Sequence, residues 1–178
     1  MSKPKVFITR TIPDKGLEII KDSCNVDVWL DDRPPSREEL LQHMQGVNGL
    51  LCLLTDKIDS HVMDAAGSQL KVISNFAVGF DNIDISAATA SGIPVGNTPD
   101  VLTDATADFA FALIISVCRR LMEGERYVRA GQWKTWNPML LLGIEMKGAT
   151  LGLVGFGRIG KAVARRAMGF EMRVIRLG

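Results

Sequence analysis

Short apolar runs alternate with amphipathic segments through the first half of the chain. The runs predict five strands, at Val6–Thr9, Val26–Trp29, Gly49–Leu54, Val72–Asn75 and Ile93–Val95. The segments between them predict helices, because Ser36–Glu39 has the spacing of a capping box and Asp59 or Ser60, and later Asp84, are suited to cap a helix. This alternation predicts a parallel α/β sheet, and Pro94 indicates that the fifth strand lies at its edge.

The second half of the chain begins with a break in this pattern. Thr98–Asp100 contains a proline between polar residues and predicts a domain boundary. A long helix is then expected from Thr103 or Asp104 to about Leu121. Because Phe109–Val117 is apolar almost all the way round, this helix is expected to contact a partner subunit as well as its own domain.

An irregular segment further along is unusually rich in large apolar side chains. Trp133–Leu142 carries two tryptophans, a methionine and three leucines in a stretch without helical or strand periodicity. Such a concentration indicates an interaction surface. The alternative is a loop that folds over its own core.

A glycine motif follows a short apolar strand at Leu151–Val154. Gly155–Gly160 has the pattern G-x-G-x-x-G, and a helix is expected next, with one face formed by Ile159, Ala162, Val163, Ala167 and Met168. The residues Phe170–Ile175 are expected to form a second strand. In this context the first glycine permits a sharp turn, the second permits close approach of a pyrophosphate, and the third permits close packing of helix on strand. The motif predicts dinucleotide binding; the alternative is a tight turn that binds nothing.

Composition and charge exclude several classes of protein. The 178 residues are 47% hydrophobic with a net charge of +1, which argues against a nucleic-acid partner. No apolar run is long enough for a membrane helix, and the N-terminus does not resemble a signal peptide. Cys24, Cys52 and Cys118 form no C-x-x-C pair and are expected to be small buried residues of a reduced, cytoplasmic protein. His43 and His61 are expected to be solvated surface residues, and no metal site is expected.

A second candidate site follows the fourth predicted strand. Ligands of open α/β sheets bind beyond the carboxyl ends of strands. There Gly79 is expected to permit an unusual turn, and the N–H groups of Ala77–Gly79 are suited to bind a small carboxylate. On residue types alone, a turn without a ligand is the more common outcome for such a glycine.

Four segments together resemble the D-isomer-specific 2-hydroxyacid dehydrogenases, with the greatest similarity to the glyoxylate/hydroxypyruvate reductase type. They are VGFDNID, GNTPDVLTDATADFAFAL, GQW and GATLGLVGFGRIGKAVARRAMGF, and the resemblance runs from Val6 to about Ile175. It implies a flavodoxin-like parallel-sheet substrate domain at residues 1–99. The start of a Rossmann dinucleotide-binding domain is implied at residues 100–178.

The resemblance also implies site residues. Backbone groups of Val78 and Gly79 match the part of the family that binds the substrate carboxylate, and Leu53 matches a residue that lines the substrate pocket. Thr106 matches a position near the nicotinamide. Thr106 and the six residues of the glycine motif are therefore the expected cofactor-binding residues: Thr106, Gly155, Phe156, Gly157, Arg158, Ile159 and Gly160. The cofactor is expected to be NAD or NADP, and the complete protein to be a homodimer.

The family's catalytic Arg, Glu and His lie downstream of the glycine motif, and no residue before Gly178 replaces them. No catalytic residue is therefore assigned, and the chain is expected to be a truncated member that is inactive alone. Two hypotheses stay open at this point. One is an oxidoreductase that reduces a small 2-oxo acid by hydride transfer, and the other is a non-catalytic dinucleotide-binding fragment or corepressor-like binding module.

Overall fold

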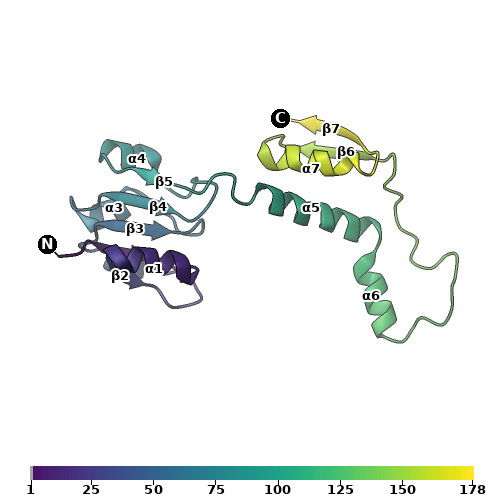
Figure 1. Ribbon diagram of the computed structural model, residues 1–178, viewed down its shortest axis with the longest axis horizontal. Helices are drawn as coiled ribbons and strands as arrows, with labels where there is room; N and C mark the ends of the chain where they lie inside the picture. Colours follow the sequence, from purple (N-terminus) through teal and green to yellow (C-terminus); the bar gives the residue numbers. More distant parts are fainter. Residues whose placement is uncertain (1) are drawn as a thin grey trace. The chain divides into compact units, whose positions relative to one another are not determined.

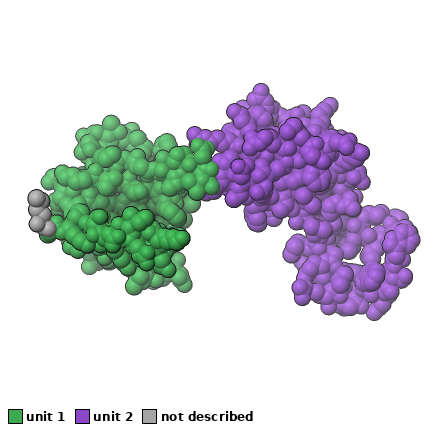
Figure 2. Space-filling view, viewed as in Figure 1, with its two compact units in different colours: residues 1–101 green, residues 102–178 purple. Residues whose placement is uncertain are grey.

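The structure is a computed structural model that describes residues 2–178. The chain divides into two compact units, residues 1–101 and residues 102–178 (Figure 2). This division lies two residues beyond the boundary expected from Thr98–Asp100. Each unit has a hydrophobic core of its own.

Unit 1 is a five-stranded parallel sheet with connecting helices (Figure 1). Its elements are β1 (Lys5–Ile8), α1 (Asp14–Ser23), β2 (Asn25–Val28), α2 (Arg37–His43), β3 (Gly49–Cys52), α3 (Ser60–Ala66), β4 (Val72–Asn75), α4 (Ile85–Ala90) and β5 (Val95–Gly96). The strand order β2-β1-β3-β4-β5 is the flavodoxin-like order, and every neighbouring pair is parallel. The predicted parallel α/β sheet is confirmed, and β5 lies at an edge as Pro94 indicated.

Polar side chains begin three of the helices of unit 1. The Ser36 hydroxyl accepts a hydrogen bond from the Glu39 N–H while the Glu39 carboxylate accepts from the Ser36 N–H, so the capping box is present. Asp59, rather than Ser60, caps α3 by accepting from the Val62 N–H. Asp84 caps α4 in the same way, and these caps set where the helices begin.

The core of unit 1 lies around its central strands. Phe7 on β1, Leu50 on β3 and Ile73 on β4 are almost fully buried and belong to one cluster. Three polar residues, Thr9, Asp56 and Asn75, are also buried, and all three follow or end a strand at the carboxyl edge of the sheet. Burial of polar groups is costly without hydrogen bonds, so this edge is where specific polar contacts are expected.

Unit 2 contains α5 (Thr103–Cys118), α6 (Leu121–Arg129), β6 (Thr150–Val154), α7 (Arg158–Met168) and β7 (Arg173–Leu177). β6 and β7 form a two-stranded parallel sheet, and α5 packs against α7. The small core contains Ala107, Phe111, Met146, Ala162, Val163 and Ala167. The Arg166 guanidinium adds polar contacts across the helix pair, because it binds the carboxylates of Asp104 and Asp108.

The helices of unit 2 differ from the sequence-based prediction in where the long helix ends and in which residues form the buried face of α7. The long helix ends at Cys118 instead of about Leu121, because Arg120 takes a left-handed conformation with φ 53° and α6 starts immediately after it. Within unit 2 only one side of α5 is covered: Phe109 and Val117 are 67% and 76% exposed. Met168 does not belong to the buried face of α7, since its side chain is mostly exposed.

The strand and loop of unit 2 are also more exposed than expected. Although the run at Leu151–Val154 is apolar, Val154 is 90% exposed, because α7 covers only one face of the two-stranded sheet. In the segment 133–142 the indole rings of Trp133 and Trp136 are exposed, while Leu140 and Leu141 are half-buried. A loop folded over its own core is therefore wrong for the tryptophans.

Candidate functional site

The glycine motif joins a strand to a helix, as the sequence predicted. β6 ends at Val154, Gly157 is the N-cap, and α7 begins at Arg158. Gly155 has φ 90°, a conformation that side chains other than glycine rarely adopt, so the sharp turn needs this residue. A Cβ added to Gly160 would lie 2.4 Å from the Gly155 carbonyl oxygen, which shows how closely the helix approaches the turn.

Open space and positive charge surround the middle of this turn. Apart from the adjacent residues and the backbone of α7, no heavy atom of residues 2–178 lies within 4 Å of a Cβ built on Gly157, so a ligand has access to the backbone there. The first turn of a helix leaves N–H groups without intrahelical partners, and the helix dipole favours an anion at this end. The guanidinium of Arg176 lies 4.8 Å from the centre of the Phe156 ring and adds a further cation beside the turn. The residues present therefore fit a pyrophosphate.

Thr106 lies in the same unit as this turn. It is half-buried in the first part of α5, next to Ala107, which packs in the core against α7. Unit 2 thus contains all seven residues expected to bind the cofactor.

The candidate substrate residues come together in unit 1. Leu53 follows β3 and Val78 and Gly79 follow β4, and these two strands are neighbours in the sheet. Within residues 2–178 no protein acceptor is bonded to the N–H groups of Val78 or Gly79. Gly79 is exposed and Val78 half-exposed, so these two donors are available to an anion.

The expected reason for a glycine at position 79 is wrong. Gly79 is not among the glycines with positive φ, so the loop does not require an unusual backbone turn there. A Cβ at this position would meet only the Asp81 carboxylate, at 3.7 Å. Glycine at this position instead keeps the space beside the exposed N–H groups open.

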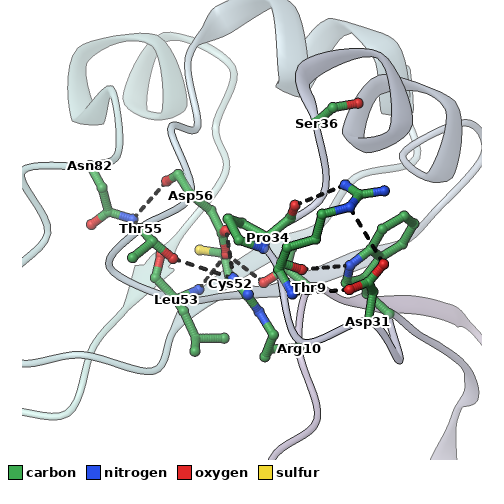
Figure 3. Close-up of polar contacts among 12 residues, drawn as sticks. Thr9, Arg10, Asp31, Pro34, Ser36, Cys52, Leu53, Thr55, Asp56 and Asn82 are labelled. Atoms are coloured by element: carbon green, nitrogen blue, oxygen red, sulfur yellow. Dashed lines mark hydrogen bonds and ion pairs between the residues drawn. The ribbon is translucent and has the colours of Figure 1, made fainter.

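A buried carboxylate that sequence reasoning missed holds the Leu53 turn (Figure 3). The side chain of Asp56 is 1% exposed, and its Oδ2 accepts hydrogen bonds from Thr9 Oγ1 at 2.5 Å and from the Leu53 N–H at 2.8 Å. Its Oδ1 lies 3.6 Å from Arg10 Nη2. Because Asp56 takes the Leu53 N–H, β3 ends at Cys52 rather than at Leu54 as predicted.

The three cysteines and two histidines differ in how far they are buried and in what they contact. Burial, with the Asp56 carboxylate adding to it, raises the pKa of the Cys52 thiol to about 12, so Cys52 stays neutral. Cys24 and Cys118 are half-buried, and the expectation that all three are buried is wrong for these two. His43 is half-buried rather than fully solvated: Nδ1 lies 2.7 Å from Asp27 Oδ2 and the ring stacks on Phe7. His61 is exposed.

Among residues 2–178, no three His, Cys, Asp or Glu side chains are grouped as a metal site requires. No helix in this described part of the chain has the length and apolar character needed to cross a membrane.

Comparison with known proteins places this geometry in a family. The model of the D-isomer specific 2-hydroxyacid dehydrogenase catalytic domain matches residues 6–172. The chain belongs to this family. It is 51% identical over 174 residues to a glyoxylate reductase of Korarchaeum cryptofilum, covering 97% of this chain and 52% of the relative. A glyoxylate reductase of Thermofilum pendens is 54% identical over 177 residues, covering 98% of this chain and 52% of the relative. The chain thus spans about half the length of these curated relatives.

Several solved structures have the same fold over this length of chain. A protein of Thermus thermophilus is 48% identical with a TM-score of 0.90, over 97% of this chain and 55% of that one. A glyoxylate reductase of Paecilomyes thermophila is 29% identical with a TM-score of 0.78, over 99% and 56% of the two chains. An acyclic imino acid reductase solved with NADPH and D-Arg is 25% identical with a TM-score of 0.82, over 98% and 56%. The predicted family and α/β fold are therefore confirmed.

Proposed function

We propose that this chain supplies the substrate-carboxylate site and the pyrophosphate site of a nicotinamide-dependent reductase of small 2-oxo acids, such as glyoxylate or hydroxypyruvate. The observation that carries the proposal is a pair of open backbone sites, one in each unit. In unit 1 the N–H groups of Val78 and Gly79 have no protein acceptor among the described residues. In unit 2 the backbone at Gly157 is open at the start of α7.

Each site has a defined task in such a reaction. The N–H groups of Val78 and Gly79 hold the carboxylate, while Leu53 limits the space beside it. Gly157, Arg158 and Ile159 hold the pyrophosphate at the N-terminus of α7. When bound, the nicotinamide cofactor supplies the hydride. These residues contribute by orientation, and no side chain of this chain is assigned the proton transfer.

The proposed cofactor is NAD or NADP, and no preference between the two is proposed. A homodimer is also proposed for the complete protein. It is supported by the exposed apolar side of α5, which includes Phe109, Leu113 and Val117, and by the exposed Trp133 and Trp136. The cytoplasmic location remains a prediction from the cysteine pattern. The non-catalytic dinucleotide-binding module remains the alternative.

Binding of NADH and NADPH to the 178-residue chain tests the cofactor part of the proposal. Cofactor fluorescence would be titrated for the wild type and for Gly157→Ala, whose added Cβ occupies space that no described residue outside the turn and α7 approaches within 4 Å. We expect weaker binding by the variant, with a small fall in the melting temperature because alanine is a poorer N-cap than glycine. Equal affinity of the two proteins would contradict a pyrophosphate at this turn.

Titration with oxalate, an unreactive analogue of glyoxylate, tests the substrate part. We expect the backbone amide signals of Val78 and Gly79 to shift in NMR spectra, and signals around Asn48, before β3 at the opposite edge of the sheet, to stay unchanged. Shifts confined to other regions would contradict a carboxylate site in this loop.

A further inference from the structure

Three consecutive carbonyl groups in the Ala77–Gly79 loop are all held by donors from unit 1. The Ala77 carbonyl accepts from the Thr98 N–H at 2.9 Å. The Val78 carbonyl accepts from Asn97 Nδ2 at 2.8 Å, and the Gly79 carbonyl accepts from Asn75 Nδ2 at 2.8 Å. A loop whose every carbonyl has a protein donor has little freedom to rotate its peptide planes.

The direction of the carbonyls fixes the direction of the amides. In a trans peptide the N–H points opposite to the C=O of the same plane, and the described residues contain no cis peptide bond. The Val78 N–H therefore points away from Thr98, which holds the Ala77 carbonyl. The Gly79 N–H points away from Asn97 for the same reason. Both donors of the proposed carboxylate site are thus oriented by bonds on the other side of their peptide planes.

Asn75 connects this loop to its neighbour. Its side chain is almost fully buried at the end of β4, and its second amide hydrogen is donated to Asn82 Oδ1 at 3.0 Å. Asn75 Oδ1 faces the Cys52 thiol, with an Sγ–Oδ1 distance of 3.4 Å. Both amide hydrogens and the amide oxygen are therefore used, so the geometry requires an amide and excludes a carboxylate of the same shape.

Asn82 carries the connection to the Leu53 turn. Its Nδ2 donates to the Leu53 carbonyl at 3.1 Å and to the Asp56 carbonyl at 3.0 Å (Figure 3). The Leu53 N–H is in turn bound by the Asp56 carboxylate. A continuous chain of hydrogen bonds thus runs from Asp56 through Leu53, Asn82 and Asn75 to Gly79, and it spans both loops of the proposed substrate site.

We propose that Asn75 and Asn82 are positioning residues that lock the two substrate loops together. Asn75 fixes the Gly79 carbonyl and so holds the loop in place, while Thr98 and Asn97 set the direction of the Val78 and Gly79 N–H groups. This inference rests on the proposed function for the identity of the ligand. The orientation of the loop is a separate property that is measurable without ligand.

The test compares Asn75→Asp with a matched control in the same unit. Asn75→Asp keeps the shape of the side chain and removes both donors. Asn48→Asp is the control, because Asn48 also ties backbone groups together, accepting from the Lys5 N–H and donating to the Gln69 carbonyl. Asn48 precedes β3, at the amino edge of the sheet, away from the substrate loops. Asn82→Ala is the second variant, since Asn82 is only half-buried and its loss is easier to tolerate than a buried carboxylate.

Three quantities would be measured for each 178-residue variant: the melting temperature, the dissociation constant for oxalate, and the NMR order parameters of the Val78 and Gly79 amides. We expect the Asn75 and Asn82 variants to bind oxalate about tenfold more weakly, the loss corresponding to one or two hydrogen bonds. The order parameters of both amides should fall in these variants, because the loop is held less firmly. Asn48→Asp should lower the melting temperature and leave both other quantities unchanged.

The outcomes separate the inference from the proposed function. If the wild type does not shift its Val78 and Gly79 signals with oxalate, the proposed carboxylate site fails, and the order parameters alone decide whether the asparagines hold the loop. Unchanged order parameters or unchanged affinity in a folded Asn75→Asp or Asn82→Ala variant would overturn the inference. So would an equal effect of Asn48→Asp, because that would be a general loss of stability.

Discussion

Replacing Gly160 with alanine measures how far unit 2 depends on the close approach of α7 to its turn. An added Cβ would lie 2.4 Å from the Gly155 carbonyl oxygen, whereas ordinary contact begins at 3.4 Å, so the backbone must open by about 3.4 − 2.4 = 1.0 Å. Because the atom in contact belongs to the backbone, no side-chain rotation relieves the overlap. Overpacking of this kind costs about 1–3 kcal/mol. Alanine in place of glycine within a helix returns about 1 kcal/mol, which leaves a net loss of up to about 2 kcal/mol.

Gly16→Ala is a matched control in the other unit. Gly16 is the third residue of α1 as Gly160 is of α7. A Cβ on Gly16 would meet only the flexible end of Ile12, at 3.4 Å, so the helix gains propensity without a clash. We expect this variant to stabilise unit 1 by up to about 1 kcal/mol.

Urea unfolding followed by NMR gives the assay, because two units need not unfold together and residue-specific signals report on each. Val163 and Ala167 report on unit 2, and Leu50 and Ile73 report on unit 1. The expected result is a lower midpoint for unit 2 in Gly160→Ala and a higher midpoint for unit 1 in Gly16→Ala. If Gly160→Ala stabilised unit 2 as much as the control stabilises unit 1, the close helix–turn contact would not be a constraint in solution.

Three further measurements follow from the site and the surface. Thiol reagents should label Cys24 and Cys118 in the native protein but Cys52 only after denaturation, since Cys52 is buried and its pKa is raised to about 12. Mass spectrometry that finds Cys52 labelled in the native protein would contradict this. Hydrogen bonds from Arg33 and then from Ser36 lower the pKa of Glu39 from 4.5 to about 2. The resulting stability is present above pH 4.5 and is lost as the pH falls from 4.5 towards 2, so Glu39→Gln should flatten the pH dependence of urea unfolding there. The 178-residue chain should not oxidise NADH with glyoxylate, because losing a general acid alone costs about 10²–10⁴-fold, and turnover at an ordinary enzymatic rate would refute this.

Local chemistry explains why much of unit 1 was predictable. The apolar runs that became β1, β3 and β4 are short and bounded by turn residues, and the caps at Ser36, Asp59 and Asp84 act on the N–H groups directly after them. Such contacts span three residues, so the sequence specifies them without knowledge of the fold. The glycine motif was predictable for the same reason, because Gly155 and Gly160 meet within one turn.

Contacts between distant residues explain the errors. His43 was expected in solvent, but its partners Asp27 and Phe7 lie on strands that only the folded sheet brings beside α2. The end of α5 gave no glycine or proline signal, and the helix nevertheless stops where Arg120 takes positive φ. The exposure of Val154 depends on which elements cover the two faces of β6, which no local pattern in β6 records.

One part of the hydrogen-bond chain that joins Asp56 to Gly79 is indicated by the sequence of β4 alone. Side chains two residues apart on a strand point to the same face, so an inward-facing Ile73 places Asn75 inward as well. A buried amide at the carboxyl end of a strand must find hydrogen-bond partners, and the nearest backbone is that of the loop that follows. An asparagine at this position therefore indicates, from the strand pattern alone, a loop that is tied down by a side chain. The strand pattern does not specify that Asn82 and Asp56 extend this tie to the Leu53 turn, since that requires β3 and β4 to be neighbours. Because β3 and β4 are neighbours, the local hydrogen bond from Asn75 to the Gly79 carbonyl becomes part of a connection between both halves of the proposed substrate site.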